Sequence, residues 1–141
     1  MILVDTNVWS ELAKPEGHPA VLAWLEANDR ELALSTLVMA EIQYGIELPK
    51  AAPKRPYLEL WLRGLEERYW TYVWNFDSED ARAYGRLAAG TEAKKRDPQI
   101  IDLQIAAQAL ARNASVATRN VKDFEWTGVP LIDPWTAGEP A

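Results

Sequence analysis

The chain has 141 residues, of which 48% are hydrophobic and 26% are charged, and these proportions are typical of a single globular domain. It contains no cysteine and one histidine, His18, which excludes disulfides, thiolate zinc sites, a cysteine nucleophile and a zinc-binding histidine pair. The net charge of −6 argues against a general polyanion-binding surface, so any contact with nucleic acid is expected to be local. Chemistry at a site must therefore rest mainly on carboxylates, whose oxygen atoms suit Mg²⁺ or Mn²⁺.

The chain shows no feature of a membrane or secreted protein. No apolar stretch approaches the roughly 20 residues that a membrane helix needs. The opening residues 1–7 have neither the basic leader nor the long apolar region of a signal peptide. We therefore expect a cytoplasmic protein that has no contact with a membrane.

The N-terminal half alternates short strands with helices. The apolar run 2–4 predicts a strand, and Val8, Trp9 and Leu12 follow at helical spacing. Next we expect a helix from about 21 to 28, a strand over 32–35, and a helix to about 48 that Ser35 or Thr36 caps. The three prolines within 49–56 predict a loop, and a further helix is expected from about 57 to 69.

The C-terminal half repeats this alternation. Residues 72–76 predict a third strand, followed by one helix from Asp77 or Ser78 to about Lys94. Pro98 is expected to start the next helix, which ends near 113, and two more strands are expected at 115–118 and 129–132. The alternation predicts an α/β/α sandwich with a mostly parallel central sheet of about five short strands. We expect one domain over residues 1–135 and a short C-terminal tail over 136–141.

Three acidic residues occupy positions that suit a functional cleft. Asp5 directly follows the first strand, where the crevice of an open α/β sheet lies, although it would also cap the next helix. Glu41 has only uncharged helical neighbours, at 37, 38, 44 and 45, so it either has a structural salt-bridge partner or faces a metal-lined cleft. Asp102 has the same apolar surroundings near the start of its helix, where the helix dipole alone would also favour an acid.

A fourth set of polar residues follows the fourth predicted strand, in the same way that Asp5 follows the first predicted strand. Thr118 offers a hydroxyl, Asn120 and Asp123 offer oxygen ligands, and Arg119 offers a guanidinium that binds phosphate. A turn alone would also explain Asn120 and Asp123. If all four places converge, they predict an Mg²⁺ or Mn²⁺ phosphodiesterase centre, because like charges tolerate one another only with a divalent cation between them.

Four sequence blocks occur in order along nearly the whole chain: MILVDTNVWSEL, LSTLVMAEIQYG, DLQIAAQAL and VATRNVKDF. Together they resemble the PIN-domain ribonucleases of the VapC type, especially their FitB-like branch. The resemblance implies a PIN-like domain, commonly a homodimer, which binds Mg²⁺ or Mn²⁺, cleaves RNA and is a toxin silenced by its cognate antitoxin protein. It also implies that Asp5, Glu41 and Asp102 are the three core acids, which hold the metal. The polar positions around them match Asn7, Ser35 and Thr118, and we expect Asn7, Ser35 and Arg119 to contact the RNA substrate.

Two departures from the family pattern leave details open. Many members have an acid at the position of Asn120, so either Asn120 is a neutral ligand through water or Asp123 takes this catalytic role. The run 96–101 lacks the glycine and isoleucine spacing common before Asp102, which leaves the shape of this loop open.

Two further features have a functional and a structural interpretation. The basic run 94–96, with Arg119 and Lys122, is either a basic lip over the acidic cleft or a solvated helix end. The helix around Trp61 is apolar on more than one side, which reflects core packing or a groove for a dimer mate or an antitoxin helix.

The leading hypothesis is a metal-dependent endoribonuclease, the toxin of a type II toxin–antitoxin system, in which Mg²⁺ or Mn²⁺ activates water for attack on phosphorus. The alternative is a PIN-like domain that has lost catalysis and binds RNA or protein, which the missing fourth acid favours. A phosphoryl-transfer enzyme or receiver domain with Asp5 as nucleophile is disfavoured, because the chain lacks a second Asp two residues later.

Overall fold

A five-stranded parallel sheet forms the centre of the computed structural model, which describes residues 1–138. The strands lie in the order β3-β2-β1-β4-β5, and each of the four neighbouring pairs is parallel. Their bounds are β1 (Ile2–Val4), β2 (Leu32–Ser35), β3 (Val73–Trp74), β4 (Ser115–Ala117) and β5 (Leu131–Ile132). The predicted α/β sandwich with a parallel sheet of short strands is confirmed.

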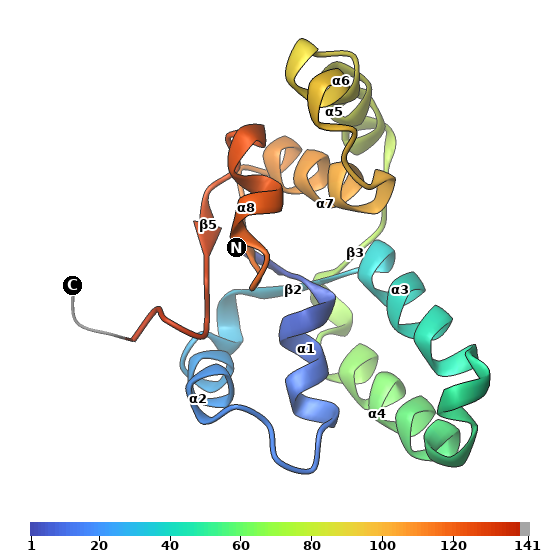
Figure 1. Cartoon of the computed structure of the whole chain (residues 1–141). Helices are drawn as coiled ribbons and strands as arrows, with labels where there is room; N and C mark the ends of the chain where they lie inside the picture. Colours follow the sequence, from blue (N-terminus) through green and yellow to red (C-terminus); the bar gives the residue numbers. More distant parts are fainter. Residues whose placement is uncertain (139–141) are drawn as a thin grey trace.

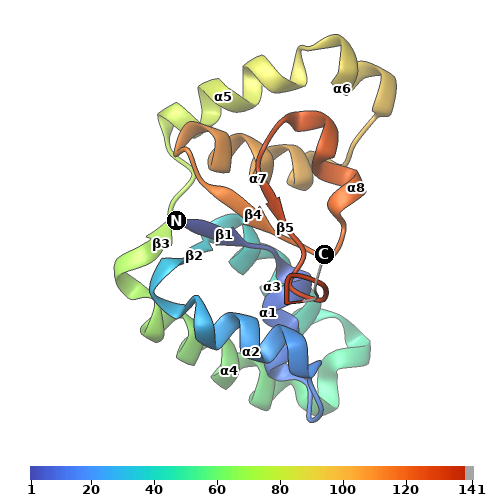
Figure 2. The ribbon, with the colours of Figure 1, turned by 90° about the vertical axis from the view of Figure 1, so that its left-hand side faces the viewer.

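Helices cover both faces of this sheet (Figure 1). One face carries α1 (Thr6–Ala13), α2 (Pro19–Ala27), α3 (Thr36–Glu47) and α4 (Arg55–Arg68). The other carries α5 (Ser78–Ala88), α6 (Thr91–Arg96), α7 (Ile100–Ala111) and α8 (Val121–Phe124), as the rotated view in Figure 2 shows. Four short 3₁₀ helices connect these elements: η1 (Asp29–Glu31), η2 (Pro49–Lys54), η3 (Trp70–Tyr72) and η4 (Glu125–Thr127). In the described part of the chain, no helix is long and apolar enough to cross a membrane.

The core lies on both sides of the two central strands. Every residue of β1 and β2 is buried, as expected for parallel strands that helices cover on each face. Trp9 on α1 and Ile105 on α7 are fully buried against opposite faces of the sheet. Because this apolar layer holds the strands rigidly, the residues that follow them are held in fixed positions.

Two predicted segments differ from the structure. The single helix expected from 78 to 94 is wrong, because α5 ends at Ala88 and α6 begins at Thr91, after Gly90 in an extended conformation. The loop expected over 49–56 is also wrong, since this segment forms η2 and the start of α4. Pro49 and Pro56 occupy the first turn of their helices, where the missing N–H costs nothing.

The order of the strands places a topological switch point at β1 and β4. Connections from β1 lead toward β2 and β3, whereas the chain returns to β4 and continues to β5. In open parallel sheets, ligands bind outside the carboxyl ends of strands at such a point. Of the expected tail, residues 136 and 137 donate backbone hydrogen bonds to the carbonyl of Asp133, and residues 139–141 lie outside the described part.

Candidate active site

Asp5 and Thr118 lie side by side at the switch point. Each follows its strand directly, and the pairing of Val4 with Ala117 brings the two residues together. The Thr118 hydroxyl donates to Asp5 Oδ2 over 2.8 Å, and the backbone N–H of Thr6 donates to Asp5 Oδ1 over 2.8 Å. Asp5 therefore does cap α1, as the structural interpretation predicted, but only one of its oxygens serves that role.

Glu41 reaches the same edge of the sheet from α3. The Thr6 hydroxyl donates to Glu41 Oε1 over 2.8 Å, so that Thr6 contacts both Asp5 and Glu41. Burial raises the pKa of Glu41, and the charge of Asp5 raises it further, although the bond from Thr6 opposes the shift. The carboxylates of Asp5 and Glu41 are far apart in the sequence but close enough in the fold for the charge of Asp5 to affect the pKa of Glu41.

Asp102 lies in the first turn of α7, on the opposite side of the cleft. Burial and, to a lesser extent, the charges of Asp5, Glu41 and Asp123 together raise its pKa to about 6. A helix N-terminus lowers the pKa of a carboxyl group, so favourable interaction with the helix dipole does not dominate at this position. The four acids form one electrostatically coupled set.

A cavity of about 610 Å³ connects three of these acids. Its lining includes Glu41, Asp102 and Asp123, together with Asn120. Asp5 is 5% exposed and lies behind this cavity, held by Thr118. Burial raises the pKa of Asp5 more than its three hydrogen bonds lower it, and the charge of Asp123 raises it again.

No lysine or arginine neutralises the cluster. Over residues 1–138, none of these four carboxylates takes part in an ion pair. The structural salt bridge considered for Glu41 is therefore not present in this part of the chain. Within residues 1–138, no group of three or more Asp, Glu, His or Cys side chains is close enough together to bind a metal ion in this conformation.

The other predicted polar residues surround Thr118. The amide of Asn7 donates to Thr118 Oγ1 over 3.3 Å and to Asp5 Oδ2 over 3.4 Å, and Asn7 Oδ1 accepts the backbone N–H of Arg119. The backbone N–H of Asn120 also donates to Thr118 Oγ1. Asn7 and Thr118 therefore orient Asp5 and the segment that carries Asn120.

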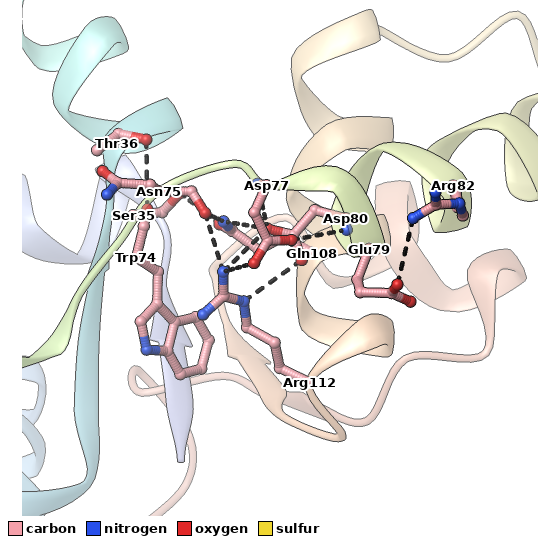
Figure 3. A network of polar contacts seen from close by, with 10 residues as sticks. All are labelled: Ser35, Thr36, Trp74, Asn75, Asp77, Glu79, Asp80, Arg82, Gln108 and Arg112. Carbon is pink, nitrogen blue, oxygen red and sulfur yellow. Dashed lines mark hydrogen bonds and ion pairs between the residues drawn. The ribbon is translucent and has the colours of Figure 1, made fainter.

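Ser35 belongs to a different polar network, which Figure 3 shows. It is fully buried, its hydroxyl donates to Gln108 Oε1 over 2.5 Å, and its oxygen accepts the N–H of Leu37 at the start of α3. Gln108 in turn donates to Asp80 Oδ2 over 3.0 Å. The structure thus directs Ser35 toward helix capping and toward Gln108, and its hydroxyl is not open to a substrate.

Sequence reasoning missed two residues of this site. Thr6 follows Asp5 directly, and this position after the first strand would have identified it as a candidate residue of the site. Trp126 lines the same cavity as the acids, together with Arg96 of the predicted basic lip. Nothing in the spacing of Trp126 separates it from the six other tryptophans of the chain.

Comparisons with known proteins identify the family and the fold. Residues 2–127 match the family described as PIN domain. The chain is 38% identical to the VapC ribonuclease Y4jK of Sinorhizobium fredii, with all of both chains covered. It is 30% identical to toxin FitB of Neisseria gonorrhoeae, over 96% of this chain and 99% of the relative. The crystal structure of FitAcB from Neisseria gonorrhoeae superposes with a TM-score of 0.84 at 30% identity, covering 96% of this chain and 99% of that one.

Proposed function

This chain belongs to the PIN-domain family, and from this premise we propose that it is an endoribonuclease, the toxin component of a type II toxin–antitoxin system. Relatives that match it over nearly their full length are named as a VapC ribonuclease and as a FitB toxin, which supports the proposal. The observation that carries it is the set of four neighbouring carboxylates, three of which line one cavity and none of which forms an ion pair within residues 1–138.

The acids fit a divalent metal by their chemistry. Carboxylate oxygens are the ligands that Mg²⁺ and Mn²⁺ prefer. Burial raises the pKa of Asp5, Glu41 and Asp102, repulsion between the acids adds to this shift, and a bound cation would relieve that repulsion. We assign Mg²⁺, with Mn²⁺ as the alternative, to these three residues. The metal, when bound, supplies a more acidic water and offsets charge on the leaving oxygen.

The protein's own side chains hold this arrangement. Thr118 and Asn7 fix the Asp5 carboxylate, and Thr6 fixes that of Glu41, so that hydrogen bonds hold both acids before any ligand arrives. Asp123 takes the fourth acidic position, and Asn120 lines the cavity beside it. We expect Arg119, whose guanidinium lies 5.0 Å from the ring centre of Trp135, to contact a phosphate of the RNA.

An apolar groove of about 830 Å³ suits the antitoxin. It lies between α1, α3 and α4, with Ile42, Ile46 and Trp61 in its wall, and it ends at Glu41. An amphipathic segment bound in this groove would cover the access to Glu41 and so block cleavage. The sequence predicted either a dimer mate or an antitoxin helix in the groove beside Trp61, and we assign the groove to the antitoxin helix. The homodimer and the cytoplasmic location stay predictions.

Incubation of the purified chain with a 5′-labelled mixed-sequence RNA tests the proposal. We expect cleavage with Mg²⁺ or Mn²⁺, no cleavage with EDTA, and a loss of about a hundredfold or more in Asp5→Asn, Glu41→Gln and Asp102→Asn. Glu47→Gln is the matched control, because Glu47 is an exposed acid on the same helix as Glu41, and it should retain full activity. RNA binding without cleavage in the native chain would instead support the alternative, a PIN domain without catalysis.

A further inference from the structure

Trp126 forms part of the wall of the acidic cavity. The cavity that contains Glu41, Asp102 and Asp123 also contains the indole of Trp126 and the basic side chains of Arg96 and Lys122. An aromatic side chain, two cations and four acids therefore border one space of about 610 Å³, since Asp97 lines it as well. The acids alone would repel a polyanion, so the other side chains must supply the attraction.

The indole is held in one orientation by its polar edge. Trp126 lies in η4, and its Nε1 donates to the carbonyl oxygen of Asp123 over 3.0 Å. The Arg96 guanidinium lies 6.0 Å from the centre of the ring, within the range of a cation–π contact. Phe124, fully buried two residues earlier, anchors α8 in the core. Trp126 is thus fixed relative to Asp123 and to the acidic cluster.

Core packing does not explain this tryptophan. Trp126 is partly buried, but it belongs neither to the core cluster of the described chain nor to the residues packed against it, whereas Trp61, Trp74 and Trp135 do pack there. A partly exposed aromatic side chain outside the core and beside the acidic cavity is in a position that suits ligand binding.

We propose that Trp126 is the platform on which one unpaired base of the RNA stacks, beside the phosphate that is cleaved. This inference rests on the proposed ribonuclease function. A base offers its face to an aromatic side chain only when it is unstacked from its neighbours, as in single strands and loops. Trp126 therefore makes the enzyme specific for unpaired RNA, while Arg96 and Lys122 contact the adjoining phosphates.

Variants of Trp126 test the role of the ring. With the mixed-sequence single-stranded RNA, we expect Trp126→Leu to raise KM about tenfold with little change in kcat, and Trp126→Phe to stay within about threefold of the native chain. Trp70→Leu is the matched control, because Trp70 is 73% exposed and does not line the cavity, and it should leave KM unchanged. Melting curves establish that the variants are folded.

An RNA that lacks one base separates stacking from a structural role. Once the cleaved bond is mapped, the base next to it is removed, and the native chain should lose about tenfold in kcat/KM on this abasic RNA. Trp126→Leu should cleave the abasic RNA and the intact RNA with about the same kcat/KM, because the variant has no indole on which the base could stack. Equal losses in both proteins at every base near the cleaved bond would overturn the platform. If the native chain cleaves no RNA with Mn²⁺, the proposed function fails. The stacking role of Trp126 is then tested by the fluorescence anisotropy of a labelled 12-nucleotide RNA. An affinity for this RNA that is unchanged in Trp126→Leu would overturn the role.

Discussion

At the scale of single residues, Asp102 has the most unusual environment in the site. Its carboxyl group is partly buried, it faces three other acids, and no cation of residues 1–138 pairs with it. Its position near the start of a helix was visible in the sequence, but the direction of its pKa shift was not. That direction depends on Asp5, Glu41 and Asp123, which only the fold brings near.

This environment predicts how stability depends on pH. The pKa of Asp102 is about 6 in the folded state and about 3.9 in an unfolded chain, so between these values the folded state binds the proton more tightly. The free energy of unfolding in EDTA should therefore fall as pH rises from about 4 to about 6, by on the order of 1–2 kcal/mol for this partly exposed group. Urea unfolding at pH 4.5 and pH 7 measures this change.

Asp102→Asn is the control for this experiment, because an amide does not titrate in this range. The difference in stability between the variant and the native chain should shift in favour of the variant as pH rises. A difference that stays constant with pH would show that Asp102 is not strained by its neighbours.

The fourth acidic position gives a second prediction. Asp123 lines the cavity and raises the pKa of both Asp5 and Asp102, whereas Asn120 adds no charge to the site. Asp123→Asn should therefore lower kcat/KM for RNA by about tenfold or more, and Asn120→Ala by less. The reverse order in a cleavage assay would make Asn120 the ligand and Asp123 a residue of the turn.

At the scale of elements, a buried network joins the two sides of the sheet (Figure 3). Gln108 on α7 contacts Ser35, which caps α3, and Asp80 on α5. Arg112, the residue after α7, pairs with Asp80 at 3.0 Å. Burial raises the pKa of Asp80, but the bonds from Arg112, the backbone of Asp77 and Gln108 outweigh it and lower the pKa. The network ties α3, which carries Glu41, to the helix that carries Asp102.

Removal of the central amide should loosen this connection. Gln108→Leu removes the acceptor of the buried Ser35 hydroxyl and one of the donors to Asp80, so we expect the free energy of unfolding to fall by about 1–3 kcal/mol. Gln104→Leu on the same helix is the matched control and should change it by less than about 0.5 kcal/mol. Urea titrations of both variants measure the two values, and equal losses would contradict a special role for Gln108.

The elements also show where sequence patterns succeed. Strands β1 and β2 were predicted because buried parallel strands are continuous apolar runs, and α7 because its apolar residues recur along a whole helix. The break at Gly90 and the helical turn at 49–54 were not predicted. In both places a glycine or proline fits either a loop or a helix end, and tertiary packing decides between them.

At the scale of the whole molecule, strand order creates the site. The acids come from residues 5, 41, 102 and 123, and their convergence follows from the switch point between β1 and β4. The place of Asp5 and Thr118 could be predicted, since each follows a strand. The network around Ser35 and the role of Trp126 could not, because they depend on side-chain contacts between separate elements, such as Ser35 with Gln108, 73 residues later, and these leave no local pattern.

The central claim is that Asp5, Glu41 and Asp102 form a strained acidic site that a divalent cation stabilises. Melting curves of the native chain and of Asp102→Asn at pH 7.5, each in EDTA and in millimolar Mn²⁺, test it most directly. We predict that Asp102→Asn melts at or above the native chain in EDTA, because the amide relieves repulsion. Mn²⁺ should raise the melting temperature of the native chain, because a hundredfold excess over Kd adds about 2.7 kcal/mol to the free energy of unfolding. The melting temperature of Asp102→Asn should rise much less. A lower melting temperature of Asp102→Asn in EDTA, with no effect of Mn²⁺ on either protein, would contradict the account.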